Sequence, residues 1–315
     1  MKVILDLDTG IDDALALALA LGRPDCELVG VTCVYGNIDV DGAVRNTLDL
    51  LSLLGHEEAP VHRGCAGPTS GAAYERKRES VVFHGANGIG GAKLPVSDAS
   101  VARTHAAEFL VKSARRWGSD LVIVPTGPLT NIARAIELDE GAMSAIGGIV
   151  LMGGALTVPG NVSPFAEANI SYDPEAANVV FTRGARVTMV GLDVTLRTTL
   201  SQSDVDSWRK LGERGVACAE ILGHYLNATK MVSPGAKGCA LHDPLALAVT
   251  LDPTYVLSVP LCVFVRTDEG QRGRTVLDQR ALEESSEREV RVALDVDSAR
   301  FVKDFMGALN VALTV

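Results

Sequence analysis

The stretch DLDTGIDDA, residues 6–14, carries four aspartates and overlaps the end of an apolar run. That run, KVILDLD at residues 2–8, predicts a buried strand, and the Ala- and Leu-rich residues 12–22 predict a helix. Gly10 permits a tight turn between the two elements. The aspartates are therefore expected at the carboxyl end of a strand, which is where ligands bind in open α/β sheets.

Apolar runs and helical patterns alternate along the first two thirds of the chain. Further strands are predicted at residues 27–36, 120–127, 146–154 and 185–193. Helices are predicted at residues 41–54, 101–117, 128–138 and 174–183. Strands that alternate with helices of this length indicate βαβ units, so the predicted fold class is α/β, with an open, mostly parallel sheet flanked by helices.

The remaining segments are less regular. Residues 64–98 and 228–243 are predicted to be long loops, which in compact domains are usually functional or mobile. The end of the chain is predicted to form a hairpin around 256–277 with Gly270 and Gly273 near its turn, a strand at 289–295 and a helix at 298–312. Because the sequence has no linker or internal repeat, one domain over residues 1–315 is expected.

Composition and charge argue against several classes of function. The formal net charge of −10 disfavours binding to nucleic-acid phosphates, and Glu75 and Glu79 bracket the basic run at 76–78. Apolar stretches fall short of the ~20 residues that a membrane span needs. The start shows no leader pattern, so a cytoplasmic protein is expected. The six cysteines lack the CxxC spacing of common zinc and redox motifs.

The aspartate cluster itself points to a cation. Carboxylates crowded at one strand end repel one another unless they share a cation or take up protons. Oxygen ligands favour a hard cation, Ca²⁺ or Mg²⁺, over zinc. The alternative is that Asp12 caps the following helix and Asp13 interacts with its dipole. A cap needs only one carboxylate, so the cluster as a whole favours the cation.

Polar side chains in later motifs mark further candidate positions. Thr126, in VPTGPLTN, lies at another strand end, where the alternative is an ordinary strand-to-helix turn. Asn161, Glu167 and Asn169 stand in an otherwise apolar segment and suit recognition of vicinal hydroxyls, although a solvated loop would give the same pattern.

Two histidines are candidates for acid–base chemistry. His242 and Asp243 are adjacent in LHDP, where the alternative is that Asp243 merely caps a helix that begins at Pro244. His84 lies within the long segment 64–98, where a lone histidine is often incidental.

Taken together, these segments resemble the inosine–uridine-preferring nucleoside hydrolase family. The matching motifs, in chain order, are DLDTGIDDA, VYGN, HGANGIGG, VPTGPLTN, LMGGA, GNVSPFAEANISYDPEAA and HDP. They lie within residues 2–250, and an aspartate cluster followed by this set is a specific signal. The resemblance implies an open α/β fold and Ca²⁺-dependent hydrolysis of the N-glycosidic bond of ribonucleosides, with release of base and ribose.

The resemblance also implies a role for individual residues. The implied metal ligands are Asp8, Asp13, the Thr126 carbonyl and Asp243, and Asp8 also takes the proton from the metal-bound water. The implied ribose contacts are Asp12, Asn37, Met152, Asn161, Glu167 and Asn169. His84 and His242 would face the leaving base, which residues 216–240 would cover. Because family members are dimers or tetramers, a homodimer or homotetramer is implied too.

Two positions depart from the commonest family pattern. Thr9 stands where proline is more frequent, and Ala168 stands where many members have an aromatic residue.

One competing interpretation is a haloacid-dehalogenase-like phosphatase with Mg²⁺, since ILDLDTG resembles the opening strand of that family. The other is a non-catalytic nucleoside-binding module that kept the pocket. The downstream motifs fit the phosphatase poorly, and a retired site would be expected to lose some of its residues.

Overall fold

The computed structural model describes residues 1–278 and 289–314 and is built around an eight-stranded sheet. Across the sheet lie β3 (Val61–Arg63), β2 (Glu27–Cys33), β1 (Lys2–Leu7), β4 (Leu121–Pro125), β5 (Gly148–Met152), β6 (Val187–Val190), β12 (Val290–Val296) and β9 (Val256–Leu261). All neighbours pair in parallel except β12 and β9. The predicted α/β fold with a mostly parallel sheet is therefore confirmed.

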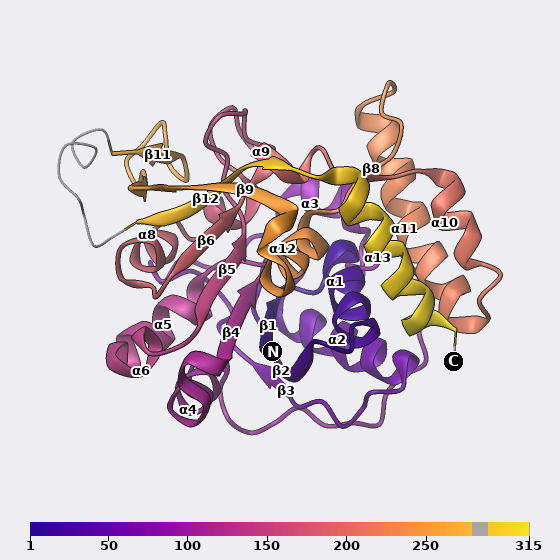
Figure 1. The fold of residues 1–315 in the computed structure, drawn as a ribbon, viewed down its shortest axis with the longest axis horizontal. Coiled ribbons are helices and arrows are strands. Elements are labelled where there is room, and N and C mark those ends of the chain that lie inside the picture. Colours follow the sequence, from indigo (N-terminus) through magenta and orange to yellow (C-terminus); the bar gives the residue numbers. More distant parts are fainter. Residues whose placement is uncertain (279–288, 315) are drawn as a thin grey trace.

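Helices cover both faces of the sheet, because side chains of each strand alternate between two cores. In β1, Val3, Leu5 and Leu7 belong to one core and Ile4 to the other. The first core is covered by α1 (Ile11–Gly22), α2 (Val40–Leu54), α10 (Gln202–Trp208), α11 (Glu213–Val232), α12 (His242–Leu251) and α13 (Ser298–Leu313). The second is covered by α4 (Ala106–Trp117), α5 (Thr130–Leu138), α6 (Glu140–Ser144) and α8 (Pro174–Arg183), and Figure 1 shows α4, α5, α6 and α8 together on one side.

Two predicted helices begin later than expected. Helix α4 starts at Ala106 instead of residue 101, because the side chain of His105 caps it by accepting a hydrogen bond from the Ala107 N–H. Helix α5 starts at Thr130 instead of residue 128, so Pro128 lies before the helix and not in its first turn. The helical pattern in the sequence extends upstream of both observed starts, so the sequence placed the beginnings of these two helices too early.

The two segments predicted as long loops contain regular structure. Residues 64–98 include α3 (Arg78–His84). Residues 228–243 include the last turn of α11, the start of α12 and β8 (Cys239–Ala240), which pairs with β7 (Thr199–Leu200). Both segments therefore present fixed side chains to the carboxyl edge of the sheet.

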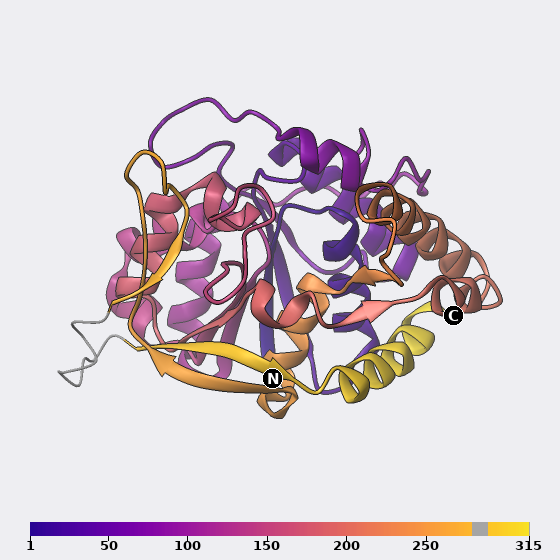
Figure 2. The same ribbon diagram turned by 90° about the horizontal axis from the view of Figure 1, so that it is seen from above.

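The predicted C-terminal hairpin is only partly correct. An antiparallel pair forms between β10 (Val263–Val265) and β11 (Thr275–Leu277), and Gly270 and Gly273 adopt positive φ in its connection. The earlier strand β9 instead pairs with β12 at the edge of the main sheet, where Figure 2 shows the two side by side in orange and yellow. The strand and helix predicted after the hairpin are confirmed as β12 and α13.

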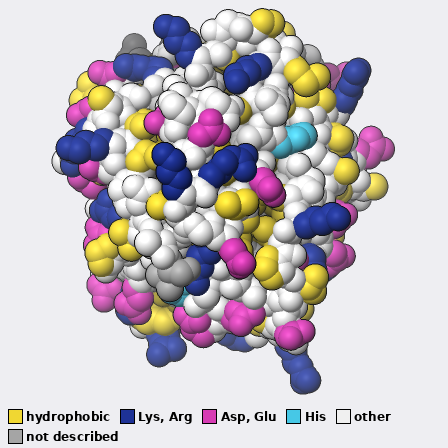
Figure 3. Space-filling model, turned by 90° about the vertical axis from the view of Figure 1, so that its right-hand side faces the viewer, with side chains coloured by type: hydrophobic (Ala, Val, Ile, Leu, Met, Phe, Trp, Pro, Cys, Tyr) yellow, Lys and Arg dark blue, Asp and Glu magenta, His cyan; other side chains and the backbone are white. Residues whose placement is uncertain are grey.

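Among the described residues, we find no helix that could span a membrane. Figure 3 shows the side on which α10 and α11 lie, where basic and acidic side chains are scattered among apolar ones.

Helix α1 carries two of the crowded aspartates, and its position depends on close packing. It is buried along almost its whole length and contacts both α12 and α13. Its last residue, Gly22, approaches α13 so closely that an added Cβ would lie 2.2 Å from the carbonyl oxygen of Ala308. A side chain at this position would push α13 away from α1.

We therefore expect Gly22→Ala to lower the free energy of unfolding by about 1–3 kcal/mol through overpacking. The matched control is Gly307→Ala in α13, where an added Cβ meets no atom within 4 Å. That control should instead raise the free energy of unfolding by up to about 1 kcal/mol, because alanine favours helix. Urea unfolding measures both, and equal effects from the two variants would contradict the packing argument.

Candidate active site

Polar side chains from several parallel strands meet at one edge of the sheet. Asp8 follows β1, Asn37 follows β2, Thr126 follows β4, and Met152 ends β5. Because the carboxyl ends of parallel strands lie together, these positions converge as expected. A cavity of about 510 Å³ opens there.

Most residues with a sequence-predicted role line this cavity. They are Asp12, Asn37, His84, Thr126, Met152, Asn161, Glu167, Asn169, His242 and Asp243. The two others, Asp8 and Asp13, are fully buried next to Asn37 in the cavity wall. The sequence therefore predicted one connected site from residues spread along the chain.

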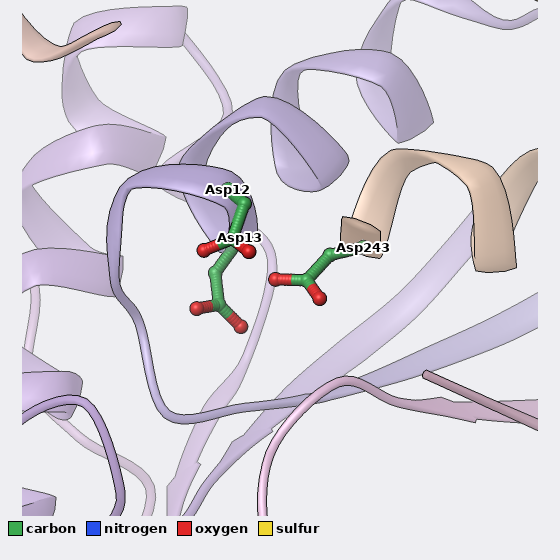
Figure 4. Close-up of side chains that lie close together, drawn as sticks. All are labelled: Asp12, Asp13 and Asp243. Atoms are coloured by element: carbon green, nitrogen blue, oxygen red, sulfur yellow. The ribbon is translucent and has the colours of Figure 1, made fainter. Parts of the chain in front are cut away.

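Three carboxylates form the acidic centre of the site. Oxygens of Asp12, Asp13 and Asp243 lie within 4.8 Å of one another, so these side chains could together hold a metal ion. Figure 4 shows Asp243, at the start of α12, pointing toward Asp12 and Asp13 at the start of α1. Burial, followed by the charge of Asp13, raises the pKa of Asp12 to about 7. Burial and the charge of Asp12 raise the pKa of Asp243 as well.

The helix-cap alternatives account for little of this cluster. The N-cap of α1 is Gly10, and its N–H donates to Asp13 Oδ2 at 2.7 Å, so Asp13 does support the helix start. Helix α12 begins at His242, so Asp243 lies inside its first turn and does not cap it.

Asp8 is tied to the acidic centre through one asparagine. The backbone N–H of Asn37 donates to Asp8 Oδ2 at 2.6 Å, and its side-chain amide lies 3.1 Å from Asp8 Oδ1 and 3.4 Å from Asp13 Oδ2. Burial, followed by the charge of Asp13, raises the pKa of Asp8. The structure thus groups Asp12 most closely with Asp13 and Asp243, and holds Asp8 beside them.

Asp6 anchors the strand that carries this loop. Its Oδ1 accepts hydrogen bonds from Thr32 Oγ1 at 2.6 Å and from Asn131 Nδ2 at 2.8 Å. These partners lie on β2 and α5, so Asp6 connects β1 to its surroundings just before the cluster. Burial raises the pKa of Asp6 to about 7.

The donor chemistry of the centre fits a hard cation. All candidate ligand atoms are oxygens, which Ca²⁺ and Mg²⁺ prefer. Thr126 lies beside the carboxylates, since its hydroxyl donates to Asp13 Oδ1 at 2.7 Å. Asp12 Oδ1 is buried without a hydrogen-bond partner in the described part of the chain. A buried carboxylate oxygen left without a donor is costly, and either a nearby cation or a hydroxyl of a bound ligand would satisfy it.

The segment after β5 contributes fixed polar groups to the opposite wall. Glu167 is 2% exposed, which rules out the solvated-loop interpretation for this residue. It accepts hydrogen bonds from the N–H groups of Gly154, Asn169 and Ile170 at 3.0, 2.8 and 3.1 Å. Asn169 Nδ2 in turn donates to the Thr126 carbonyl at 2.7 Å. This wall is therefore joined directly to the acidic centre.

Both predicted histidines are buried and line the cavity. The backbone N–H of Ile11 donates to His84 Nδ1 at 3.1 Å, so the neutral His84 ring carries its proton on Nε2. This contact needs Gly10, where an added Cβ would lie 2.5 Å from His84 Nδ1. His242 Nδ1 lies 2.8 Å from Thr195 Oγ1. Burial lowers the pKa of His84 to about 3 and that of His242 to about 4.

The outer part of the cavity is built by α3 and α11, which contact each other. His224 Nε2 lies 3.2 Å from the carbonyl oxygen of Val82, and the rings of Phe83 and Tyr225 are 5.7 Å apart in an edge-on arrangement. Tyr225 and Thr229, which belong to the segment 216–240 that the resemblance implied would cover the base, line the cavity.

The sequence analysis did not predict three residues at this site, Lys77, Tyr172 and Thr195. Lys77 and Tyr172 line the cavity, with the Lys77 ammonium 4.2 Å from the Tyr172 ring centroid. Lys77 belongs to the basic run at 76–78, which gave no sign of a binding site because Glu75 and Glu79 flank it. Thr195 is the hydrogen-bond partner of His242, 47 residues away in sequence, and no motif connected the two.

The fold and the cavity define an α/β enzyme with an acidic, oxygen-lined site at the strand ends. The family model "inosine-uridine preferring nucleoside hydrolase" matches residues 3–303. The chain therefore belongs to this family, which makes it a ribonucleoside hydrolase by class and confirms the resemblance. The phosphatase interpretation finds no support.

Named relatives and a solved structure are similar over nearly the whole chain. The probable uridine nucleosidase 1 of Oryza sativa is 34% identical, with 98% of this chain and 97% of the relative covered. The pyrimidine-specific ribonucleoside hydrolase RihA of Salmonella gallinarum is 35% identical, with 96% of each covered. The structure of a purine-preferring ribonucleoside hydrolase from Gardnerella vaginalis is 43% identical, with a TM-score of 0.97 and 100% and 99% coverage.

Crowding of the carboxylates predicts an unusual effect on stability. In chelator, Asp243→Asn should raise the free energy of unfolding by about 1–2 kcal/mol, because it removes one of three mutually repelling buried charges. Adding a divalent cation should then stabilise the wild type more than the variant.

The control for this experiment is Asp193→Asn. Asp193 is also buried, but it accepts hydrogen bonds from the N–H groups of Leu156 and Thr157, so its replacement should destabilise the protein. Thermal unfolding with and without cation measures all three proteins. Destabilisation of the Asp243 variant in chelator would refute the argument from repulsion.

Proposed function

We propose that the protein hydrolyses the N-glycosidic bond of ribonucleosides with Ca²⁺ bound at the acidic centre and with Asp8 as the general base. The observation that carries this proposal is the burial of Asp12, Asp13 and Asp243 beside one another in the wall of the cavity. The proposed ligands are Asp8, Asp13, the Thr126 carbonyl and Asp243. A bound Ca²⁺ would orient a water molecule and lower its pKa.

Asp8 is suited to accept the proton of the attacking water. Its carboxylate is fixed by two hydrogen bonds from Asn37, and it lies next to Asp13 at the acidic centre. Burial raises its pKa, which makes the carboxylate a stronger base than an exposed aspartate.

The opposite wall is suited to hold the sugar. We assign the ribose hydroxyls to the amide and carboxylate groups of Asp12, Asn37, Asn161, Glu167 and Asn169, with Met152 beside the ring. When the base departs, positive charge develops on the sugar, and the carboxylates of Asp12 and Glu167 would stabilise it. Fixing the hydroxyls contributes further by holding the sugar in a reactive position.

His84 and His242 are assigned to the departure of the base. A base leaves more easily when a donor neutralises the charge that builds up on it. Both rings line the cavity, and His84, the last residue of α3, has its ring centroid 5.9 Å from that of Tyr225 on α11. The similar proteins that are named for uridine, pyrimidine and purine preference are 34%, 35% and 43% identical to this chain. Purine and pyrimidine nucleosides therefore both belong in the test.

The decisive experiment incubates the purified protein with inosine, adenosine, guanosine, uridine and cytidine and measures released ribose. We expect release that chelator abolishes and Ca²⁺ restores. Intact nucleosides that nevertheless bind would support the non-catalytic alternative. Restoration by Mg²⁺ but not by Ca²⁺ would overturn the proposed cation.

Asp8→Asn tests the proposed base. Loss of the proton acceptor should lower kcat by about 10²–10⁴-fold. The protein should remain folded, since asparagine has nearly the same shape. The surface control is Asp41→Asn, whose carboxylate is exposed and pairs with Arg63, and its kcat should match that of the wild type. Wild-type turnover by the Asp8 variant would exclude Asp8 as the base.

We further propose a homodimer or homotetramer and a cytoplasmic location. The first rests on the family resemblance, and the second rests on the composition of the sequence. Light scattering on the purified protein measures the oligomeric state.

A further inference from the structure

Thr195 is a buried residue with an unusual connection to the cavity. It is the last residue of α9 (Leu192–Thr195), which follows β6, and its side chain is 0% exposed. Its hydroxyl lies 2.8 Å from Nδ1 of His242, on the ring that lines the cavity. The nitrogen turned toward Thr195 is not available to a ligand, so Nε2 is the one that remains for the cavity.

The two residues are held together by neighbouring backbone. The Thr198 hydroxyl lies 3.0 Å from the Thr195 carbonyl oxygen and 3.3 Å from that of Leu241, and the Leu241 N–H donates back to the Thr198 carbonyl at 2.8 Å. Immediately beyond, β7 and β8 pair in antiparallel orientation. The end of α9 and the start of α12 therefore form one fixed unit.

The direction of the Thr195–His242 hydrogen bond follows from counting protons. A threonine hydroxyl has a single proton to donate. For the Thr195 hydroxyl, the described residues offer no acceptor other than His242 Nδ1. If Nδ1–H donated instead, the hydroxyl proton would be buried without an acceptor, which costs free energy. The favoured arrangement has Thr195 donating to Nδ1.

We propose that Thr195 is a positioning residue, whose hydroxyl holds the neutral His242 ring with its proton on Nε2 and aims that N–H at the departing base. His84 is held in the same form by the backbone N–H of Ile11. The cavity thus has two neutral histidines with the same tautomer, one fixed by backbone and one by a side chain. The Thr195 hydroxyl belongs to a side chain, so a substitution can remove it without changing the backbone.

This inference rests on the proposed nucleoside hydrolysis. As the bond between C1′ and the base breaks, its electron pair passes to the base, and His242 Nε2–H donates a hydrogen bond to the resulting charge. No proton leaves the ring, so the base takes its proton from solvent. The attacking water adds to C1′ and gives its proton to Asp8. A neutral imidazole can stabilise a developing anion in this way.

The test compares two leaving groups in Thr195→Val, which keeps the shape and removes the hydroxyl. With the best nucleoside, kcat should fall about 10–100-fold, while KM should change less than about threefold. With 4-nitrophenyl β-D-riboside, whose phenolate needs little help to leave, kcat should fall less than about threefold. Thr195→Ser, which keeps the hydroxyl, should restore most of the nucleoside activity.

Two controls separate positioning from a structural effect. Thr250→Val removes another buried hydroxyl from the same helix as His242, one that donates to the Ala246 carbonyl, and should leave both activities unchanged. In a His242→Gln background, Thr195→Val should cause no further loss, because the hydroxyl acts only through the ring. An equal loss on both substrates, or no loss on the nucleoside, would overturn the proposal.

A measurement on the wild type does not depend on the folding of any variant. With ¹⁵N-labelled histidine, NMR distinguishes protonated from unprotonated ring nitrogens, and the signal absent from His242→Gln assigns the ring. We expect Nδ1 unprotonated and Nε2 protonated, and the reverse would refute the assignment. Failure of the wild type to cleave any nucleoside would instead reject the proposed function and leave the tautomer intact.

Discussion

Repulsion between buried carboxylates is the constraint around which this protein is organised. Asp12, Asp13 and Asp243 reach one point from two helices, and burial raises the pKa of each. Donors from Gly10, Asn37 and Thr126 offset part of the cost, but one oxygen of Asp12 remains without a donor. The tight packing of α1 against α12 and α13 holds the charges in place. Part of the free energy gained on folding is therefore offset by the cost of holding these buried carboxylates together.

The sequence predicted features that depend on local pattern. Alternating apolar runs indicated the parallel sheet, and its topology then determined that residues such as Asp8 and Thr126 would meet. Features that depend on one specific tertiary contact were not predictable. Helix α3 lies in a Gly-rich segment without clear periodicity, and His105 gave no recognisable cap signal ahead of α4. The hydrogen bond between Thr195 and His242 joins the end of α9 to the start of α12, and neither stretch of sequence contains a pattern that predicts it.

The cavity has two kinds of wall. The inner wall consists of strand ends and the first turns of α1 and α12, where side chains such as Asp8, Asp13 and Asn169 are held by hydrogen bonds to the backbone or to another site residue. The outer wall consists of α3 and α11, which lie outside the sheet and meet through side-chain contacts such as that between Phe83 and Tyr225. The proposed cation, general base and sugar contacts belong to the inner wall, whereas the region assigned to the base, with His84 at the end of α3, belongs to the outer one.

This separation bears on how such a fold changes over evolutionary time. Substitutions among the cavity-facing side chains of α3 and α11 can reshape the outer wall, whereas the buried face of α11 belongs to the core that packs on the sheet. Substitutions in the inner wall would alter the charge balance and the stability of the whole chain together. If the proposed assignment holds, the preferred base can change while the sugar contacts stay fixed, which is consistent with similar proteins that are named for pyrimidine and for purine preference.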